Sequence, residues 1–256
     1  MQLFNITVVS LTKNKMKRLN IFILLTALTF SYGANAHTPA VKTINLHQER
    51  TIGEFKGIAS GGSVRIKLTM GSKEALRMEG DAAAIAELTT EVENGILIIK
   101  PKTKWNDWSR RYNRAIVTVY ITAKRITSLT LSGSGSIETL NTINSPSELV
   151  TTLSGSGSID ATANVKSFSG VISGSGALNI KGKTSNSNLS LSGSGSFQGK
   201  NFSVDQLSVQ VSGSADVYVH VNEKIEAVIS GSGSIQYSGN PAIKKTIIGS
   251  GSISKM

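Results

Sequence analysis

The chain has 256 residues, no cysteine and a formal net charge of +11 at pH 7. Without cysteine it forms no disulfide bond and lacks the residue that carries the lipid of a lipoprotein. Hydrophobic residues make up 39% of the sequence, aromatic residues 5% and charged residues 17%. This composition fits an all-β protein with an aliphatic core.

The first 36 residues have the features of a signal peptide. Met16-Lys17-Arg18 supplies positive charge, a short apolar stretch runs from Leu19 to Phe30, and Ala34-Asn35-Ala36 forms an A-x-A cleavage site before His37. The apolar stretch is shorter than the roughly 20 residues that span a membrane. We therefore expect cleavage and export to the periplasm, the outer-membrane surface or the medium, without a lipid anchor. Met16 is an alternative start.

Residues 37–130 carry most of the charge of the mature chain. They hold 15 basic and 9 acidic residues, a net charge of +6, whereas residues 131–256 carry only +1. Alternating apolar residues predict irregular strands here. Asp81 is placed to cap a helical turn over Ala82 to Leu88, and Asn94-Gly95 is a two-residue hairpin signal. The phrase Ser60-Gly61-Gly62-Ser63-Val64 resembles a shortened copy of the repeat described below.

The segment from residue 100 to residue 125 combines cations with aromatic side chains. Asp107 is its only acidic residue. Amphipathic aromatic rings beside arginine suit an anionic glycan or a lipid headgroup. Alternatively, the segment is a solvated loop whose aromatic residues pack on the fold. The candidate ligand-binding residues are Trp105, Trp108, Arg110, Arg111, Tyr112 and Arg114.

Residues 131–256 contain seven copies of a Ser-Gly-Ser-Gly phrase. Successive copies are 22, 19, 19, 20, 18 and 18 residues apart, a period typical of stacked repeats. The residue just before each copy and the residue just after it are apolar every time, from Leu131 and Ile137 to Ile247 and Ile253. A flexible linker has no reason to keep such columns in register. The first glycines of the copies are Gly133, Gly155, Gly174, Gly193, Gly213, Gly231 and Gly249.

We therefore predict an all-β solenoid in which each Ser-Gly phrase is a tight corner. Glycine reverses the chain without strain and lets the backbones of stacked coils approach closely. Each coil buries its apolar residues on the coils above and below it. We expect one domain over residues 37–256, with an irregular half (37–130) and regular repeats (131–256) whose corners recur every 18–22 residues.

Five phrases, taken together, resemble the head GIN domain family of autotransporter adhesins. They occur in this order: Phe55-Lys56-Gly57-Ile58, Ser63 to Leu68, Leu76 to Asp81, Asn94 to Ile99, and Tyr237-Ser238-Gly239-Asn240-Pro241. The resemblance extends over roughly Leu46 to Ile253. It implies a right-handed β-helix-like fold and a place in the cell envelope or on its surface. It brings no catalytic residues.

The sequence offers little support for catalysis or metal binding. No Gly-Lys-Ser/Thr follows a corner as in a phosphate loop, and His37, His47 and His220 lack metal-ligand spacing. We expect no cofactor, no metal, and, in an exported protein, no nucleic acid. The favoured function is a non-catalytic binding or adhesion module of the envelope. The alternatives are a carbohydrate-active β-helix enzyme and a purely structural, self-assembling protein with weak self-association through the C-terminal solenoid edge.

Overall fold

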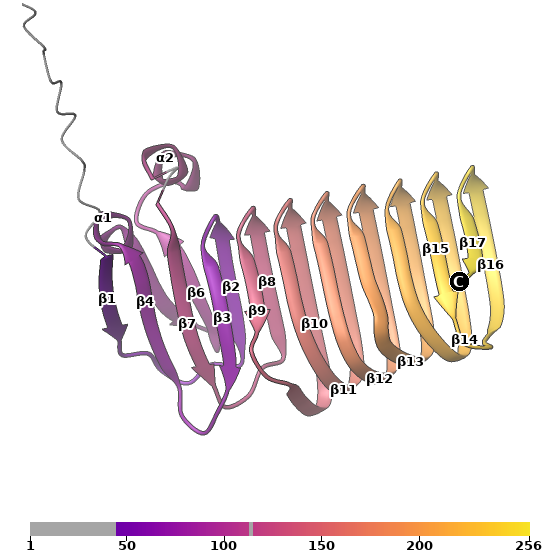
Figure 1. Ribbon diagram of the computed structural model, residues 1–256, viewed down its shortest axis with the longest axis horizontal. Coiled ribbons are helices and arrows are strands. Elements are labelled where there is room, and N and C mark those ends of the chain that lie inside the picture. The colour runs from indigo at the N-terminus through magenta and orange to yellow at the C-terminus, as the bar shows by residue number, and fades with distance from the viewer. Residues whose placement is uncertain (1–44, 113–114) are drawn as a thin grey trace, which may run out of the picture. The chain divides into compact units, whose positions relative to one another are not determined.

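The computed structural model describes residues 45–112 and 115–256, which form a β-solenoid of stacked coils (Figure 1). The signal peptide assigned to residues 1–36 lies outside these residues. In each regular coil, one strand rises to a Ser-Gly corner and the next descends from it. The strands of this part are β8 (Ser128–Gly133), β9 (Ser136–Thr139), β10 (Ile143–Gly155), β11 (Ser158–Gly174), β12 (Ala177–Gly193), β13 (Ser196–Gly213), β14 (Asp216–Gly231), β15 (Ser234–Ser238), β16 (Ala242–Gly249) and β17 (Ser252–Lys255).

The repeats stack in the register that the sequence predicts. Parallel pairing places Gly155 beside Gly133 and Gly174, and this glycine column continues without a break to Gly249. The apolar columns that begin at Leu131 and Ile137 are in register in the same way. Most of their side chains are buried, and a cluster of Phe168, Phe197 and Phe202 fills the middle of the stack. The predicted solenoid and its corners are confirmed.

The corners need glycine for two independent reasons. Gly174 has a φ of +119°, a region that side chains avoid, and a Cβ added to it would lie 2.6 Å from the carbonyl oxygen of Gly155 in the preceding coil. That oxygen accepts a hydrogen bond of 2.9 Å from the amide of Ser175. Because carbonyl groups of the neighbouring coil satisfy the corner amides, the serine hydroxyls are not needed for this purpose. Ser154, Ser173 and Ser175 are all exposed.

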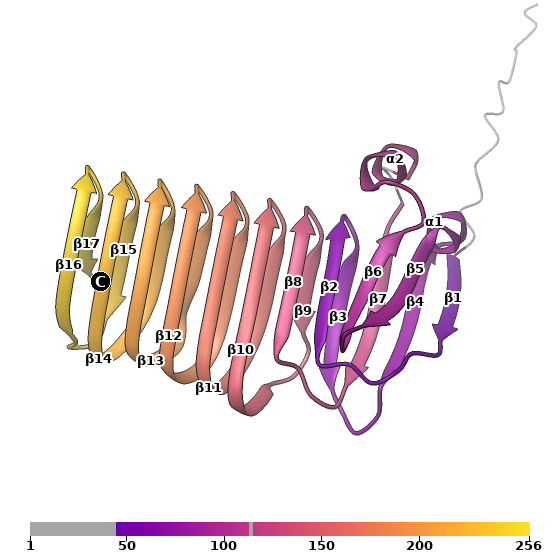
Figure 2. The same cartoon turned by 180° about the vertical axis from the view of Figure 1, so that it is seen from behind.

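The N-terminal part stacks in an order that differs from the order along the chain. The coil of β2 and β3 lies between β6 and β7 on one side and β8 and β9 on the other (Figures 1 and 2). Its corner at Gly62 pairs with Gly133, so the corner column begins there. The elements of this part are β1 (Asn45–Arg50), β2 (Gly57–Gly62), β3 (Arg65–Met70), β4 (Ala75–Asp81), α1 (Ala82–Ala86), β5 (Leu88–Glu93), β6 (Ile96–Pro101), α2 (Trp105–Arg111) and β7 (Val117–Ala123).

Antiparallel strands close this end of the solenoid. β4 pairs with β7 and β1, while β5 and β6 form a hairpin whose turn residues Asn94 and Gly95 both have positive φ, as predicted. Asp81 caps α1 by accepting a 2.8 Å hydrogen bond from the amide of Ala84. The guanidinium of Arg50 donates to the carbonyl oxygen of Leu88 (2.7 Å) and so links β1 to β5. Neither helix in the described part of the chain has the length and apolar character needed to cross a membrane.

Candidate ligand-binding groove at the serine corners

Helix α2 occupies the place that a Ser-Gly corner takes in the other coils, between β6 and β7. Its first residue, Trp105, lies on the corner of the adjoining coil. A Cβ added to Gly61 would lie 2.7 Å from Nε1 of Trp105, so the absence of side chains at Gly61 and Gly62 makes room for the indole ring. The helix is therefore seated on the first corner of the column.

The buried side chain of Trp108 anchors α2 to the rest of the fold. Its side chain is only 2% exposed, and its Nε1 donates a 3.3 Å hydrogen bond to the carbonyl oxygen of Ala84 in α1. Its ring meets that of Trp105 edge to face, with 5.8 Å between centroids, and lies 5.6 Å from that of Tyr112. The aromatic residues of the segment thus pack together, and Trp108 is not accessible to a ligand.

The cations of α2 point to the surface. Arg110 and Arg111 are exposed, whereas Trp105 and Tyr112 are half-buried. The guanidinium of Arg110 forms an ion pair of 2.6 Å with Asp107, one turn earlier. Arg114 lies outside the described residues. Of the six candidate residues, Arg110 and Arg111 are therefore the ones most open to an anionic ligand.

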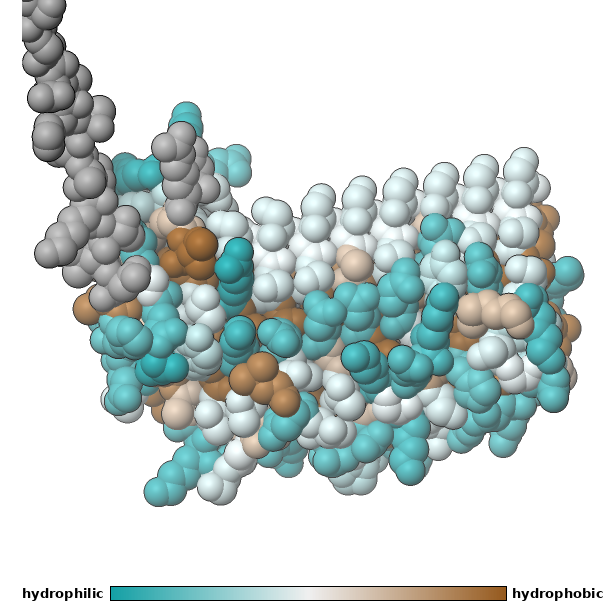
Figure 3. Space-filling view, in the orientation of Figure 1, coloured by the Kyte–Doolittle hydropathy of each residue, from teal (hydrophilic) through white to brown (hydrophobic). Residues whose placement is uncertain are grey.

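A groove of about 500 Å³ runs beside this helix, along the first corners of the column. Serine residues of four successive corners line it, among them Ser63, Ser134, Ser156 and Ser175. Ala115 and Ile116, which follow α2, form one wall. In the space-filling view the corners form a pale row along one edge of the stack (Figure 3). Because coils repeat at about 4.8 Å, the groove presents hydroxyl groups at a short, regular interval.

Arg65 supplies a positive charge to the groove. It is the first residue of β3, and the alternation of that strand buries Ile66 and turns Arg65 outward. The alternation predicts that Arg65 faces solvent, but its place beside the serine residues depends on the stacking of β3 against β9, which puts Arg65 next to Ser136. Ile116 is 56% exposed at the same groove. Polar hydroxyls, one guanidinium and an apolar wall are therefore brought together.

The family comparison matches residues 54–241 to the domain described as "Putative auto-transporter adhesin, head GIN domain". The chain belongs to this family. Among curated proteins no significant sequence relative was found.

Several solved structures of bacterial proteins share this fold. A putative adhesin of Bacteroides fragilis matches with a TM-score of 0.75 and 20% identity, covering 83% of this chain and 97% of that one. A putative lipid binding protein of Parabacteroides distasonis has a TM-score of 0.67, 24% identity and coverages of 84% and 98%. A putative adhesin of Parabacteroides merdae has a TM-score of 0.60, 16% identity and coverages of 84% and 97%. At these identities the likeness establishes the fold alone.

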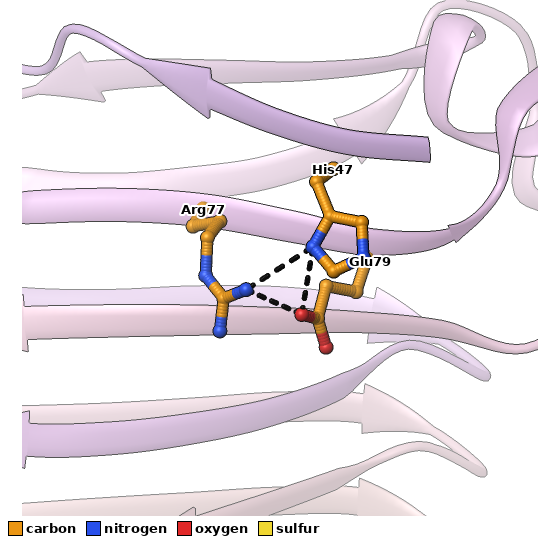
Figure 4. Close-up of polar contacts among 3 residues, drawn as sticks. All are labelled: His47, Arg77 and Glu79. Carbon is orange, nitrogen blue, oxygen red and sulfur yellow. Dashed lines mark hydrogen bonds and ion pairs between the residues drawn. The ribbon is translucent and has the colours of Figure 1, made fainter. Parts of the chain in front are cut away.

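Outside the groove, this head GIN protein has a polar cluster on the outer face of the N-terminal sheet (Figure 4). His47 of β1 lies opposite Glu79 of β4, with 3.0 Å between Nδ1 and Oε1. Arg77 contacts both residues and also stacks over the ring of Tyr120, 4.5 Å from its centroid. The hydrogen bond with Tyr120, aided by the charges of Arg77 and His47, lowers the pKa of Glu79. The cluster sits on an open sheet face, where it forms a structural network.

Other carboxyl groups of the head GIN protein also have pKa values below the ordinary value. Glu54, Glu91 and Glu226 each have a lowered pKa, chiefly because each accepts a hydrogen bond from a lysine. Glu54 lines a cavity of about 420 Å³ in which Lys124 binds Glu54 (2.9 Å) and Glu74 (3.2 Å). A lowered pKa keeps a carboxyl group ionised at neutral pH, whereas a general acid needs a raised one.

We expect Glu79 to make stability depend on pH in the acidic range. Because its pKa is lowered in the folded state, its contribution is present above the ordinary value of 4.5 and is lost as the pH falls through the folded-state pKa. The free energy of unfolding of Glu79→Gln should therefore lie below that of the wild type at pH 7 and approach it at pH 3. Glu148→Gln, at an exposed position of β10, is the control. A difference for Glu79→Gln that stays constant from pH 7 to pH 3 contradicts the prediction.

Proposed function

We propose that this protein is a non-catalytic, adhesion-type binding module of the cell envelope whose ligand is an anionic glycan. The observation that carries the proposal is the groove of serine hydroxyls from four successive corners, with Arg65 among its lining residues. Hydroxyl groups bind sugar hydroxyls, and a guanidinium binds a carboxylate or sulfate through two parallel hydrogen bonds. A linear polysaccharide presents such groups at short regular intervals, which suits a ladder of identical corners.

Three further observations support the proposal. The family description names an auto-transporter adhesin, and adhesins act outside the cytoplasm. The signal-peptide features of residues 1–36 are consistent with export. Lysine and tyrosine partners lower the pKa of carboxyl groups such as Glu54 and Glu79. A glycan-cleaving enzyme needs one carboxyl group with a raised pKa as its general acid, so the lowered values do not favour that alternative. Arg110 and Arg111 of α2 are exposed and add positive charge to the N-terminal part of the molecule.

Anionic lipid is the second candidate, because one relative of the same fold is named a lipid binding protein. The two ligands share the chemistry of an anionic group recognised by arginine. The experiment below therefore includes both a polysaccharide and vesicles.

We expect the mature chain to bind polygalacturonate, with weaker binding at higher salt, and not to bind neutral dextran. Arg65→Ala should weaken the binding at least about tenfold, since a hydrogen bond to a charged group contributes about 1.5–3 kcal/mol. Arg110→Ala/Arg111→Ala should weaken it less, because these side chains are exposed to solvent and are not among the residues that line the groove. Isothermal titration calorimetry provides the affinities.

The matched control is Lys166→Ala/Lys183→Ala, which removes two exposed charges at a different cavity, near the opposite bend of the coils. Its affinity for polygalacturonate should stay within about twofold of the wild type. Equal losses in the control and in Arg65→Ala would reduce the binding to net charge and overturn the proposed site. Binding to phosphatidylglycerol vesicles without binding to polygalacturonate would assign the groove to lipid.

A further inference from the structure

The last coil, made of β16 and β17, leaves a strand edge open on each face of the solenoid (Figure 1). β16 pairs in parallel with β14, and β17 pairs in parallel with β15. In the described part of the chain, β14 is the pairing partner of β16 and β15 that of β17, and no further strand pairs with their opposite edges. The backbone amide and carbonyl groups along these edges are therefore available to a further strand.

The same coil exposes side chains that are core residues in every earlier coil. Ile243, Ile247 and Ile253 continue the inward columns of Ile225, Ile229 and Ile235, which are fully buried. Ile243 is 40% exposed, while Ile247 and Ile253 are half-buried. Apolar surface is visible at this end of the stack (Figure 3). One additional strand on β16 would bury Ile243 and Ile247.

This open end is positively charged. β16 and β17 contain Lys244, Lys245 and Lys255 and no acidic residue. Lys244 faces outward beside Glu226, whose pKa it helps Lys224 to lower. Lys245 stands in the inward column directly after Ala227, where the earlier coils hold small or aliphatic residues with one threonine. The strand edge thus combines core-like isoleucines with two adjacent lysines.

These charges disfavour a second copy of the chain as the occupant. Two copies meeting at this end would bring six lysines together, and each Lys245 would lose water without gaining a partner. An inward-pointing charge on an edge strand is a recognised defence against pairing between copies. A strand with acidic side chains, by contrast, would neutralise both lysines while its backbone pairs with β16.

We propose that the free edge of β16 binds an extended, acidic segment of a partner polypeptide, which adds to the solenoid as a further strand. Backbone hydrogen bonds supply affinity in this mode of recognition, and side-chain pairing supplies specificity. The site lies at the C-terminal end of the stack, whereas the serine groove lies beside α2 at the N-terminal end of the corner column. The inference therefore does not depend on the proposed glycan ligand.

Two octapeptides test the proposal against the full mature chain. One has the sequence of residues 242–249, and the other is the same peptide with Lys244→Glu and Lys245→Glu. Both carry the same isoleucines, so they differ only in charge. We expect the acidic peptide to bind at least about tenfold more tightly, with an affinity that falls as salt rises, and to slow hydrogen exchange of the β16 amides.

The protein variant Lys244→Glu/Lys245→Glu provides the reciprocal measurement, since both positions are exposed, and its circular dichroism spectrum is compared with that of the wild type. It should prefer the lysine peptide. An unchanged preference in the variant overturns the proposal, and so does equal binding of both peptides or binding of neither to the wild type. Sedimentation that shows wild-type dimers, lost in an Ile243→Glu variant, would assign the edge to a second copy and also overturn it.

Discussion

Replacing Gly174 with alanine is expected to destabilise the protein by at least about 2 kcal/mol. A φ of +119° is strained for any residue with a Cβ, and the new methyl group would approach the carbonyl oxygen of Gly155, which belongs to rigid backbone. Relief requires the two coils to separate, and that weakens the hydrogen bond between the Ser175 amide and the same oxygen. Urea unfolding followed by circular dichroism measures the loss.

Ser175→Ala is the control in the same corner. Its side chain is exposed and its amide is already satisfied by the preceding coil, so stability should change by no more than about 0.5 kcal/mol. If Gly174→Ala unfolds at the same urea concentration as the wild type, the glycine column is not required for the corner geometry, and this account of the repeat is wrong.

Trp108→Ala is expected to cost about 3–5 kcal/mol, the usual range for a large aromatic residue in a core. The substitution removes a buried ring that contacts Trp105 and Tyr112, and it leaves the carbonyl oxygen of Ala84 without its indole donor. Trp108→Phe retains the aromatic packing and should lose about 1 kcal/mol for the hydrogen bond. Thermal unfolding of the two variants separates these contributions.

The control for this pair is Arg111→Ala, at an exposed position of the same helix, which should unfold like the wild type. The comparison also decides between the two interpretations of the aromatic residues in segment 100–125. If Trp108→Ala is as stable as the wild type but no longer binds polygalacturonate, Trp108 contacts the ligand and the packing described above is not its role.

The repeats could be predicted from the sequence because each position of the repeat recurs seven times, so its residue type can be compared between copies. A column that stays apolar from Leu131 to Ile247 has one simple structural explanation, and the glycine column fixes the register independently of it. Local signals in the N-terminal half were equally informative, since the Asp81 cap and the Asn94-Gly95 turn depend only on neighbouring residues.

Contacts between distant residues could not be predicted in this way. The coil of β2 and β3 is separated along the chain from the coils on which it stacks, so the proximity of Arg65 to Ser136 has no local signal. The packing of Trp105 on Gly61 has no local sequence signal for the same reason. The aromatic residues in segment 100–125 could therefore be assigned to packing only from the structure.

The direction of the hydrogen-bond ladder has a mechanical consequence. The bonds between coils run along the stacking axis. A pull on the C-terminus peels the last coil from the one before it, so the bonds of that coil break in succession from the free end before those of the next coil do. The coils would detach one after another. A coil occupies about 4.8 Å of the stack, yet a released repeat of 18 to 20 residues extends to roughly 60–70 Å. A tethered molecule built in this way lengthens stepwise under tension and dissipates work at each step.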